Sequence, residues 1–227
     1  MFQSGHRNYD QDNEGLRYGE DNWKYVVNDY QKTPVKPTLD GEPSYEGIPQ
    51  GLHDTTQPYW TDSDVRRYAY WSVFAGACGF TYGNSAIMQF HKENDKSSAY
   101  GVKDLWEVAL NAPGAIQMKY LKQLILSKSY LDRIPAQDLI AGKQGEKYDY
   151  MAATRGKNYA FIYTFNGSNI NINLDILRFN KTKASWYNPR NGVYTSIGVF
   201  KAKGIRTFNP PGEKTNGNDW ILILERI

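Results

Sequence analysis

The sequence holds one cysteine and three histidines in 227 residues. Cys78 has no partner for a disulfide within the chain, and a single cysteine does not report the redox compartment. It lies in a run of small residues (74–79) typical of a helix, which predicts a buried structural thiol. Three scattered histidines and one cysteine do not make a metal-ligand set. Asp10, Asp12 and Glu14 lack the spacing and the bidentate glutamate of a calcium loop, so no metal is expected.

Long apolar runs and strong net charge are also absent. No apolar stretch approaches the roughly 18 residues that a membrane span needs. The 27 basic and 24 acidic residues leave a net charge of +3, which is too balanced to favour nucleic acid or an anionic membrane as a partner. No glycine-rich phosphate loop and no nucleophile-elbow motif occur.

The first residues do not form a signal peptide. Residues 1–6 carry neither a basic n-region nor an apolar h-region. They are typical instead of a buried strand that ends in an active-site loop, which predicts that the chain begins within a domain.

What the sequence does have is aromatic residues. They make up 15% of the chain and include 18 tyrosines and 6 tryptophans. This content suits a carbohydrate binder, whose rings stack on sugars, and it suits ordinary cores and β-sandwiches equally well.

The first 140 residues alternate between short strands and amphipathic helices, with long loops after the strands. Apolar positions at helical spacing predict helices over 22–30, 65–79 and 115–127, with an N-cap at residues 62–64 and Gly79 just past the second helix. Strands are expected at 2–5, 35–42 and 80–83. Loops 43–61 and 84–103 are far longer than the usual 4–6 residues. Functional loops that follow strand ends are typical of a (β/α)8 barrel, of which only a C-terminal portion fits here.

The pattern changes after about residue 140. Strands are expected over 159–165, 169–174, 184–187 and 219–224, with turn residues such as those of 188–192 between them. This spacing predicts a small antiparallel β-sandwich. The sequence therefore divides into an α/β part at 1–140 and an all-β part at 141–227.

The segment with the clearest chemistry is residues 40–46, Asp-Gly-Glu-Pro-Ser-Tyr-Glu. Glu42 ends a predicted strand, where a barrel enzyme places its reactive groups. Glycoside hydrolysis needs two carboxylates across the scissile bond, and Glu42 is the candidate nucleophile, with Glu46 as its rival. Tyr45 is placed to donate a hydrogen bond to Glu42. The alternative is that both glutamates are loop carboxylates that cap a helix or pair with Arg66 or Arg67, and the motif alone leaves this open.

Several stretches of the sequence resemble one protein family, and they occur in the same order as in that family. They are residues 3–6, 40–46, 67–79, 82–83, 184–192, 208–211 and 219–222. The first four resemble the end of the catalytic barrel of the apiosidase-like glycoside hydrolases, and the last three resemble the collagen-binding type of β-domain that follows that barrel. The resemblance implies a retaining glycosidase without a cofactor that acts on a complex polysaccharide. It also implies that residues 1–140 hold about strands 6–8, and that the acid/base carboxylate, on the fourth strand, lies outside the chain.

The resemblance favours Glu42 as the catalytic residue and assigns further side chains to substrate binding. His6 follows the first strand, Asp40 precedes Glu42 by two residues, and Trp60 lies in the loop after it. Tyr82 and Asn84 follow the last barrel strand, and Tyr45 and Glu46 complete the set. Each of these has a structural alternative: Trp60 can anchor its own loop, Tyr82 can pack the barrel mouth, and Asp40 can be a turn residue.

A second hypothesis is a non-catalytic module that binds carbohydrate or protein. A flat aromatic strip on the β-domain would favour carbohydrate, but Trp186 and Trp220 lie in strand-like settings where core packing is expected. The expected partner of the enzyme is an oligo- or polysaccharide, with no nucleic acid and no membrane span, and the oligomeric state is open. Periplasmic or secreted localisation follows from the resemblance alone.

Overall fold

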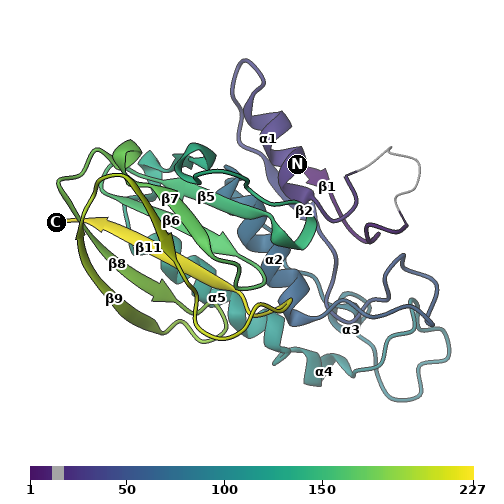
Figure 1. Ribbon diagram of the computed structural model, residues 1–227. Coiled ribbons are helices and arrows are strands. Elements are labelled where there is room, and N and C mark those ends of the chain that lie inside the picture. The colour runs from purple at the N-terminus through teal and green to yellow at the C-terminus, as the bar shows by residue number, and fades with distance from the viewer. Residues whose placement is uncertain (12–17) are drawn as a thin grey trace. The chain divides into compact units, whose positions relative to one another are not determined.

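The computed structural model describes residues 1–11 and 18–227, which separate into two compact units (Figure 1). The first unit comprises Met1–Val73 and Ala77–Lys119, and the second comprises Phe74–Gly76 and Tyr120–Ile227. The chain is thus a mixed α/β part followed by a part built on β-sheet. Each unit is described by itself.

The first unit contains a parallel three-stranded sheet in the order β1-β2-β3. Its strands are short: β1 (Phe2–Gln3), β2 (Leu39–Glu42) and β3 (Gly79–Phe80). Helical crossovers join them, as parallel strands require. The helices are α1 (Asn22–Tyr30), α2 (Asp62–Phe74), α3 (Ser85–Met88), α4 (Trp106–Ala109) and α5 (Pro113–Leu126), the last of which begins in the first unit.

Local periodicity predicted α1 and α5 well, did not reveal α3 inside the expected loop 84–103, and predicted the strand ends poorly. The helix over 22–30 is confirmed, and the helix predicted at 115–127 is α5, with Pro113 at its first position. The second strand begins at Leu39 rather than at residue 35, because Pro34 and Pro37 cannot donate to a sheet ladder. The first and third strands end at Gln3 and Phe80, before the expected residues 5 and 83.

Helix α2 begins and ends earlier than predicted. Asp62 lies within the helix. Thr61 directly precedes the first turn of α2, and its N–H and its hydroxyl both donate to the Asp64 carboxylate, at 2.9 and 2.8 Å. The helix ends at Phe74, and Gly76 takes the positive φ of +117° that ends the segment, so Gly79 as the residue past the helix was wrong. Cys78 is exposed and lies outside the helix, with Sγ 3.1 Å from the Thr38 carbonyl oxygen. The prediction of a buried helical thiol was therefore wrong.

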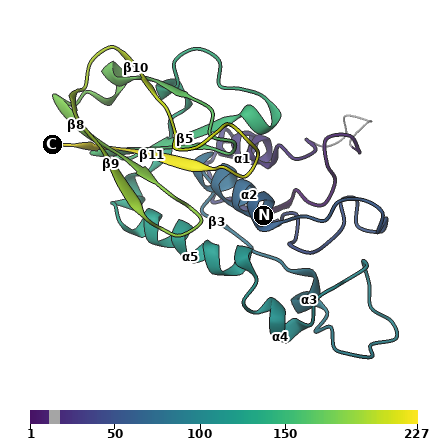
Figure 2. The same ribbon diagram turned by 60° about the horizontal axis from the view of Figure 1, so that its bottom comes forward.

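The second unit contains a six-stranded antiparallel sheet in the order β4-β5-β6-β11-β8-β9 and a two-stranded sheet of β7 and β10 (Figures 1 and 2). The strands are β4 (Ile134–Pro135), β5 (Met151–Arg155), β6 (Tyr159–Thr164), β7 (Ile170–Asn173), β8 (Lys181–Tyr187), β9 (Tyr194–Lys201), β10 (Ile205–Phe208) and β11 (Trp220–Arg226). Four 3-10 helices complete it: η1 (Tyr130–Asp132), η2 (Gln137–Leu139), η3 (Lys147–Asp149) and η4 (Leu174–Leu177).

One hydrophobic core contains side chains of both sheets. Ile170 and Ile172 of β7 are fully buried while Asn171 between them is exposed, as the alternating pattern predicted. Trp186 and Trp220 belong to the same core at 5% and 9% exposure, with ring centroids 6.3 Å apart. Core packing of these two tryptophans is confirmed, and neither presents a flat aromatic surface.

Candidate active site

The carboxyl ends of the three parallel strands meet at one edge of the first unit's sheet. Glu42 is the last residue of β2, and its carbonyl oxygen accepts hydrogen bonds from the N–H groups of Ser4 and Gly5 at 3.1 and 3.0 Å. The loop after β1 is thereby attached to the end of β2. In open and closed parallel sheets this edge is where ligands bind.

The Glu42 carboxylate is partly open to solvent, with 45% of the side chain exposed. Its Oε1 accepts a hydrogen bond from Gln3 Nε2 at 2.8 Å and lies 3.5 Å from His6 Nε2. Both contacts come from the strand end before it, so the carboxylate is oriented from one side and stays accessible on the other. Gln3 was not among the predicted site residues, and its place at the end of the neighbouring strand was the available signal.

His6 is buried, at 3% exposure. Burial lowers its pKa below the usual value of 6.5, against the opposing effect of the Glu42 charge and hydrogen bond. The imidazole is therefore neutral at pH 7, with Nε2 facing the carboxylate and Nδ1 without a hydrogen-bond partner among the described residues.

Trp60 and Tyr45 hold His6 in place. The Trp60 indole N–H donates to the His6 carbonyl oxygen at 3.3 Å, and the Trp60 side chain is only 1% exposed. The structure thus places Trp60 as an anchor of the loop, with almost no surface for a sugar. The Tyr45 ring packs edge-on against His6, with centroids 4.9 Å apart.

The Tyr45 hydroxyl does not make the predicted hydrogen bond with Glu42 in the part of the chain that the structure describes. Burial raises its pKa, and the nearby charges of Glu42 and Asp40 raise it further, so the hydroxyl stays protonated. The ring instead lies against Gly83, where a Cβ atom would come within 2.1 Å of it. Only glycine at this position leaves room for Tyr45.

Asp40 is fully buried behind the strand edge. It accepts hydrogen bonds from Ser4 Oγ at 2.6 Å, from Asn22 Nδ2 at 3.0 Å and from Ser72 Oγ at 3.4 Å. Burial raises its pKa, although these donors oppose the shift. The side chain joins the loop after β1 to α1 and α2, and nothing of it reaches the surface.

Glu46 differs sharply from Glu42, four residues earlier. Its side chain is 9% exposed, and its carboxylate accepts hydrogen bonds from the Tyr82 hydroxyl at 2.6 Å and from the Gly114 N–H at 3.1 and 3.2 Å. Gly114 is the second residue of α5, so Glu46 caps that helix. Burial raises the pKa of Glu46, and the two donors oppose the shift.

Tyr82 and Asn84 extend the same network. Asn84 caps α3 by accepting from the N–H groups of Ala86 and Ile87 at 2.9 and 3.3 Å, and its amide lies 3.4 Å from the Tyr82 hydroxyl. Beside them is a pocket of about 320 Å³. It is lined in part by Tyr59, whose ring is covered by the Lys103 ammonium at 3.6 Å from the centroid.

Metal ligands are not gathered anywhere in residues 1–11 and 18–227, where no group of three or more His, Cys, Asp or Glu side chains is suitably placed. Asp12 and Glu14 lie outside the described residues. Among the described helices, none has both the length and the apolar character of a membrane span.

The site thus has one accessible carboxylate, that of Glu42, at the carboxyl end of a parallel strand. Residues 1–132 match the family described as "Apiosidase-like, catalytic domain", and residues 134–225 match the one described as "Putative collagen-binding domain of a collagenase". The chain belongs to the apiosidase-like family, with a collagen-binding-like domain after the catalytic part.

Two solved structures resemble the whole chain. One is named "Glycoside hydrolase" and is 44% identical with a TM-score of 0.92; the other is a glycoside hydrolase family 5 protein from Bacteroides vulgatus ATCC 8482, 43% identical with a TM-score of 0.94. Each match covers 100% of this chain but only 52% and 50% of the solved chains, so the chain spans about half their length. No curated protein matches it.

Proposed function

We propose that residues 1–140 are the C-terminal portion, about strands 6–8, of a (β/α)8 barrel, and that residues 141–227 are a β-sandwich. The parallel order β1-β2-β3 with helical crossovers supports the first assignment. The two antiparallel sheets that share one core support the second. The function of the assembled barrel is hydrolysis of O-glycosyl bonds in a complex polysaccharide, with retention of configuration.

Glu42 is the nucleophile in this proposal. The observation that carries it is the contrast among three neighbouring carboxylates: Glu42 is 45% exposed at the strand end, while Asp40 and Glu46 are buried and bonded to the protein. A nucleophile must reach the anomeric carbon, and Glu42 is the most exposed of these three carboxylates. Gln3 and His6 hold its Oε1, which leaves Oε2 for attack.

The acid/base carboxylate comes from outside these 227 residues. Retaining enzymes place their two carboxyl groups about 5–5.5 Å apart across the bond that is cleaved. Asp40 and Glu46, the other candidates near Glu42, are committed to hydrogen bonds within the fold. This polypeptide alone is therefore inactive, and it supplies the nucleophile half of the site.

Substrate binding falls to the side chains around Glu42. Neutral His6 and the Tyr45 ring border the carboxylate directly, whereas Tyr82, Asn84 and Trp60 act through the loops that they fix. The substrate is an oligo- or polysaccharide, and no cofactor takes part. Periplasmic or secreted localisation fits an enzyme that meets such polymers.

The test is Glu42→Gln in the complete enzyme that contains the remaining strands. Turnover should fall by several orders of magnitude while thermal unfolding stays close to that of the unaltered enzyme. Proton NMR of the first product formed should show the anomeric configuration of the substrate. Unaltered turnover in Glu42→Gln would remove Glu42 from the mechanism, and an inverted product would remove its role as a nucleophile.

A further inference from the structure

The sequence contains three Asn-Gly dipeptides, and all three lie in the second unit. They are residues 166–167, 191–192 and 216–217. The three glycines have similar positive φ angles, of +72°, +75° and +85° in chain order. An Asn-Gly dipeptide can rearrange without an enzyme, because glycine has no Cβ atom to keep its nitrogen away from the asparagine side chain. What differs among the three is how firmly the reacting groups are held.

Asn166 is fixed by burial and by hydrogen bonds. Its side chain is 3% exposed, and Nδ2 donates to the Asp149 carboxylate at 2.7 Å. Its Oδ1 accepts from the N–H and the hydroxyl of Ser168, at 3.1 and 2.7 Å. The amide group of Asn166 would have to leave all of these partners before it could react.

Asn191 lies in an exposed turn, but both of its reacting groups have partners. Its side-chain Oδ1 accepts from the Val193 N–H at 3.0 Å. The Gly192 N–H, whose nitrogen would attack, donates to the Asn188 carbonyl oxygen at 2.8 Å. These two bonds hold the nitrogen and the side chain apart from each other's chemistry.

Asn216 lies in the loop that joins β10 to β11 (Figure 2). It is exposed, and within the part of the chain that the structure describes neither its side chain nor the Gly217 N–H makes a hydrogen bond. The Asn218 N–H donates to the Thr215 carbonyl oxygen at 3.0 Å, which makes residues 215–218 a tight turn with the dipeptide at its centre. The nitrogen and the side-chain carbon therefore lie in one short turn and have no partners to give up.

We propose that Asn216 is a site of spontaneous modification, at which the folded chain forms aspartate and isoaspartate while Asn166 and Asn191 stay intact. The Gly217 nitrogen attacks Asn216 Cγ and loses its proton, the Cγ–Nδ2 bond breaks, and ammonia leaves with that proton. Water then opens the cyclic imide, at Cγ to give aspartate or at the main-chain carbonyl carbon to give isoaspartate. Attack within one chain needs no second reactant to be brought into place. The proposal does not depend on the proposed hydrolysis.

Isoaspartate would lengthen the main chain in this loop, because the side-chain methylene becomes part of the backbone. The loop is organised by the residue that follows the dipeptide. Asn218 Nδ2 donates to the carbonyl oxygens of Pro211 and Glu213 at 3.0 and 2.8 Å, and its Oδ1 accepts from the Trp220 indole N–H at 3.0 Å. The modification therefore disturbs the contacts that attach the loop to the start of β11.

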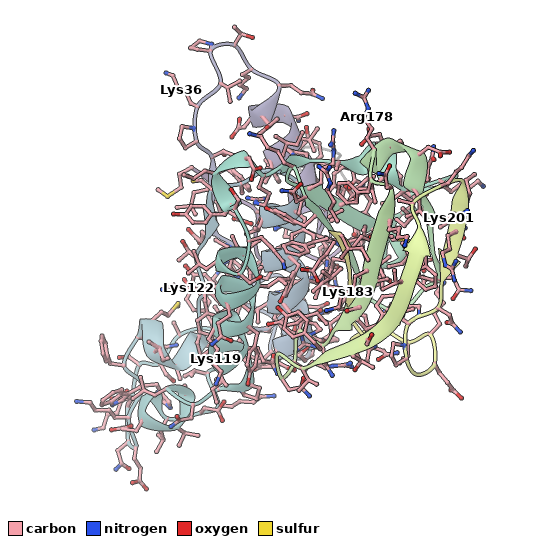
Figure 3. All side chains as sticks on the ribbon, turned by 90° about the vertical axis from the view of Figure 1, so that its left-hand side faces the viewer. Lys36, Lys119, Lys122, Arg178, Lys183 and Lys201 are labelled. Atoms are coloured by element: carbon pink, nitrogen blue, oxygen red, sulfur yellow. The ribbon has the colours of Figure 1, made fainter. Side chains whose placement is uncertain are left out.

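The test is to incubate the 227-residue chain at mildly alkaline pH, folded and in urea, and to follow its tryptic peptides by mass spectrometry. Trypsin places the three dipeptides in separate peptides, 158–178, 191–201 and 215–226. Arg178 and Lys201, which end the first two, are labelled in Figure 3. Replacement of NH2 by OH raises the mass of whichever peptide has reacted.

In the folded chain Asn216 should convert at least about tenfold faster than Asn191 or Asn166, because each of these must first give up hydrogen bonds. In urea, where no such bonds persist, the three rates should be similar. Isoaspartate is identified by its methylation by an isoaspartyl methyltransferase. Hydrogen exchange at the Asn218 amide should accelerate as the product forms.

Asn216→Gln should abolish conversion in peptide 215–226, because the longer side chain disfavours ring closure. Asn191→Gln is the matched control in the other exposed turn, and it should leave the rate at Asn216 unchanged. Circular dichroism checks that each variant is folded. The proposal would be overturned by an intact Asn216 in the folded chain, by equal rates at the three sites in the folded chain, by a rate difference that persists in urea, or by conversion of peptide 215–226 in the folded Asn216→Gln variant.

Discussion

Replacing Glu42 and Glu46 in turn by alanine makes the same chemical change at two positions four residues apart, and the structure gives it opposite consequences. Glu46→Ala removes the acceptor for the buried Gly114 N–H and for the Tyr82 hydroxyl. Glu42→Ala removes a contact to Gln3, which is exposed and can turn to water. We expect the first variant to lose stability and the second to lose chemistry.

The size of the Glu46→Ala effect follows from its contacts. A buried donor left without a partner costs about 1–3 kcal/mol, and the one methylene group that is lost contributes about 0.8 kcal/mol. The Tyr82 hydroxyl is only half-buried and can rotate, so the total is about 3 kcal/mol. In a chain of this size that is a fall in melting temperature of about 6–12 °C. For Glu42→Ala we expect less than about 1 kcal/mol.

Two measurements check this prediction. Thermal unfolding is fitted with separate transitions, because a chain with two units need not unfold in one step. Hydrogen exchange at the Gly114 amide reports the cap directly, and it should accelerate in Glu46→Ala but not in Glu42→Ala. Equal melting temperatures in the two alanine variants, or an unchanged Gly114 exchange rate, would refute the assignment of Glu46 as a structural cap.

Glutamine at position 46 tests the role of Glu46 in a second way. At position 46 its carbonyl can accept from Gly114 and its amide can donate to the Tyr82 oxygen, so Glu46→Gln should recover most of the stability. Because burial raises the pKa of Glu46 above 4.5, its contribution to stability is complete below 4.5 and is lost as the pH rises through the higher folded value. Glu46→Gln should therefore gain on the unaltered chain as the pH rises from about 4.

Three further predictions concern other parts of the fold. Glu20→Gln removes the fully buried ion pair between Glu20 and Arg67, which still has Asp64 at 3.5 Å, and should cost about 3–5 kcal/mol in urea unfolding, whereas a cost below about 1 kcal/mol would contradict the pairing. Burial lowers the pKa of His6 in the folded chain, so the unfolded chain takes up a proton at this residue first as the pH falls. The free energy of unfolding should therefore decrease as the pH falls from above 6.5 towards the lower folded pKa. His6→Gln should remove this pH dependence, and an equal pH dependence in both proteins would contradict the prediction. Trp186→Ala opens the core of the second unit and should cost about 3–5 kcal/mol by calorimetry, an expectation that a near-normal melting temperature would contradict.

The parts of the fold that could be predicted from the sequence are those with a local cause. The helix at Asn22–Tyr30 and the alternation in β7 follow from apolar spacing over a few residues, and the structure has both. Strand ends depend on partners elsewhere: β3 stops at Phe80 because its neighbour β2 pairs with it only through Leu39 and Asp40. The exposure of Cys78 likewise depends on where the chain leaves α2, which the run of small residues did not reveal.

The candidate site shows the same limit in a form that bears on function. Glu42 and Glu46 are the same residue type in one motif, and what separates them is supplied by Gln3, Tyr82 and Gly114, which are 39, 36 and 68 residues away from the glutamate that each contacts. A Cβ atom at residue 114 would lie 2.4 Å from Glu46 Oε2, so the glycine there is required by the buried carboxylate. Among the residues that the structure describes, Glu42 has no such close backbone partner for its side chain, and its surroundings leave one face open. A carboxylate that the fold encloses serves the fold, and one that the fold orients but leaves accessible is free to react, which is the reason to favour Glu42.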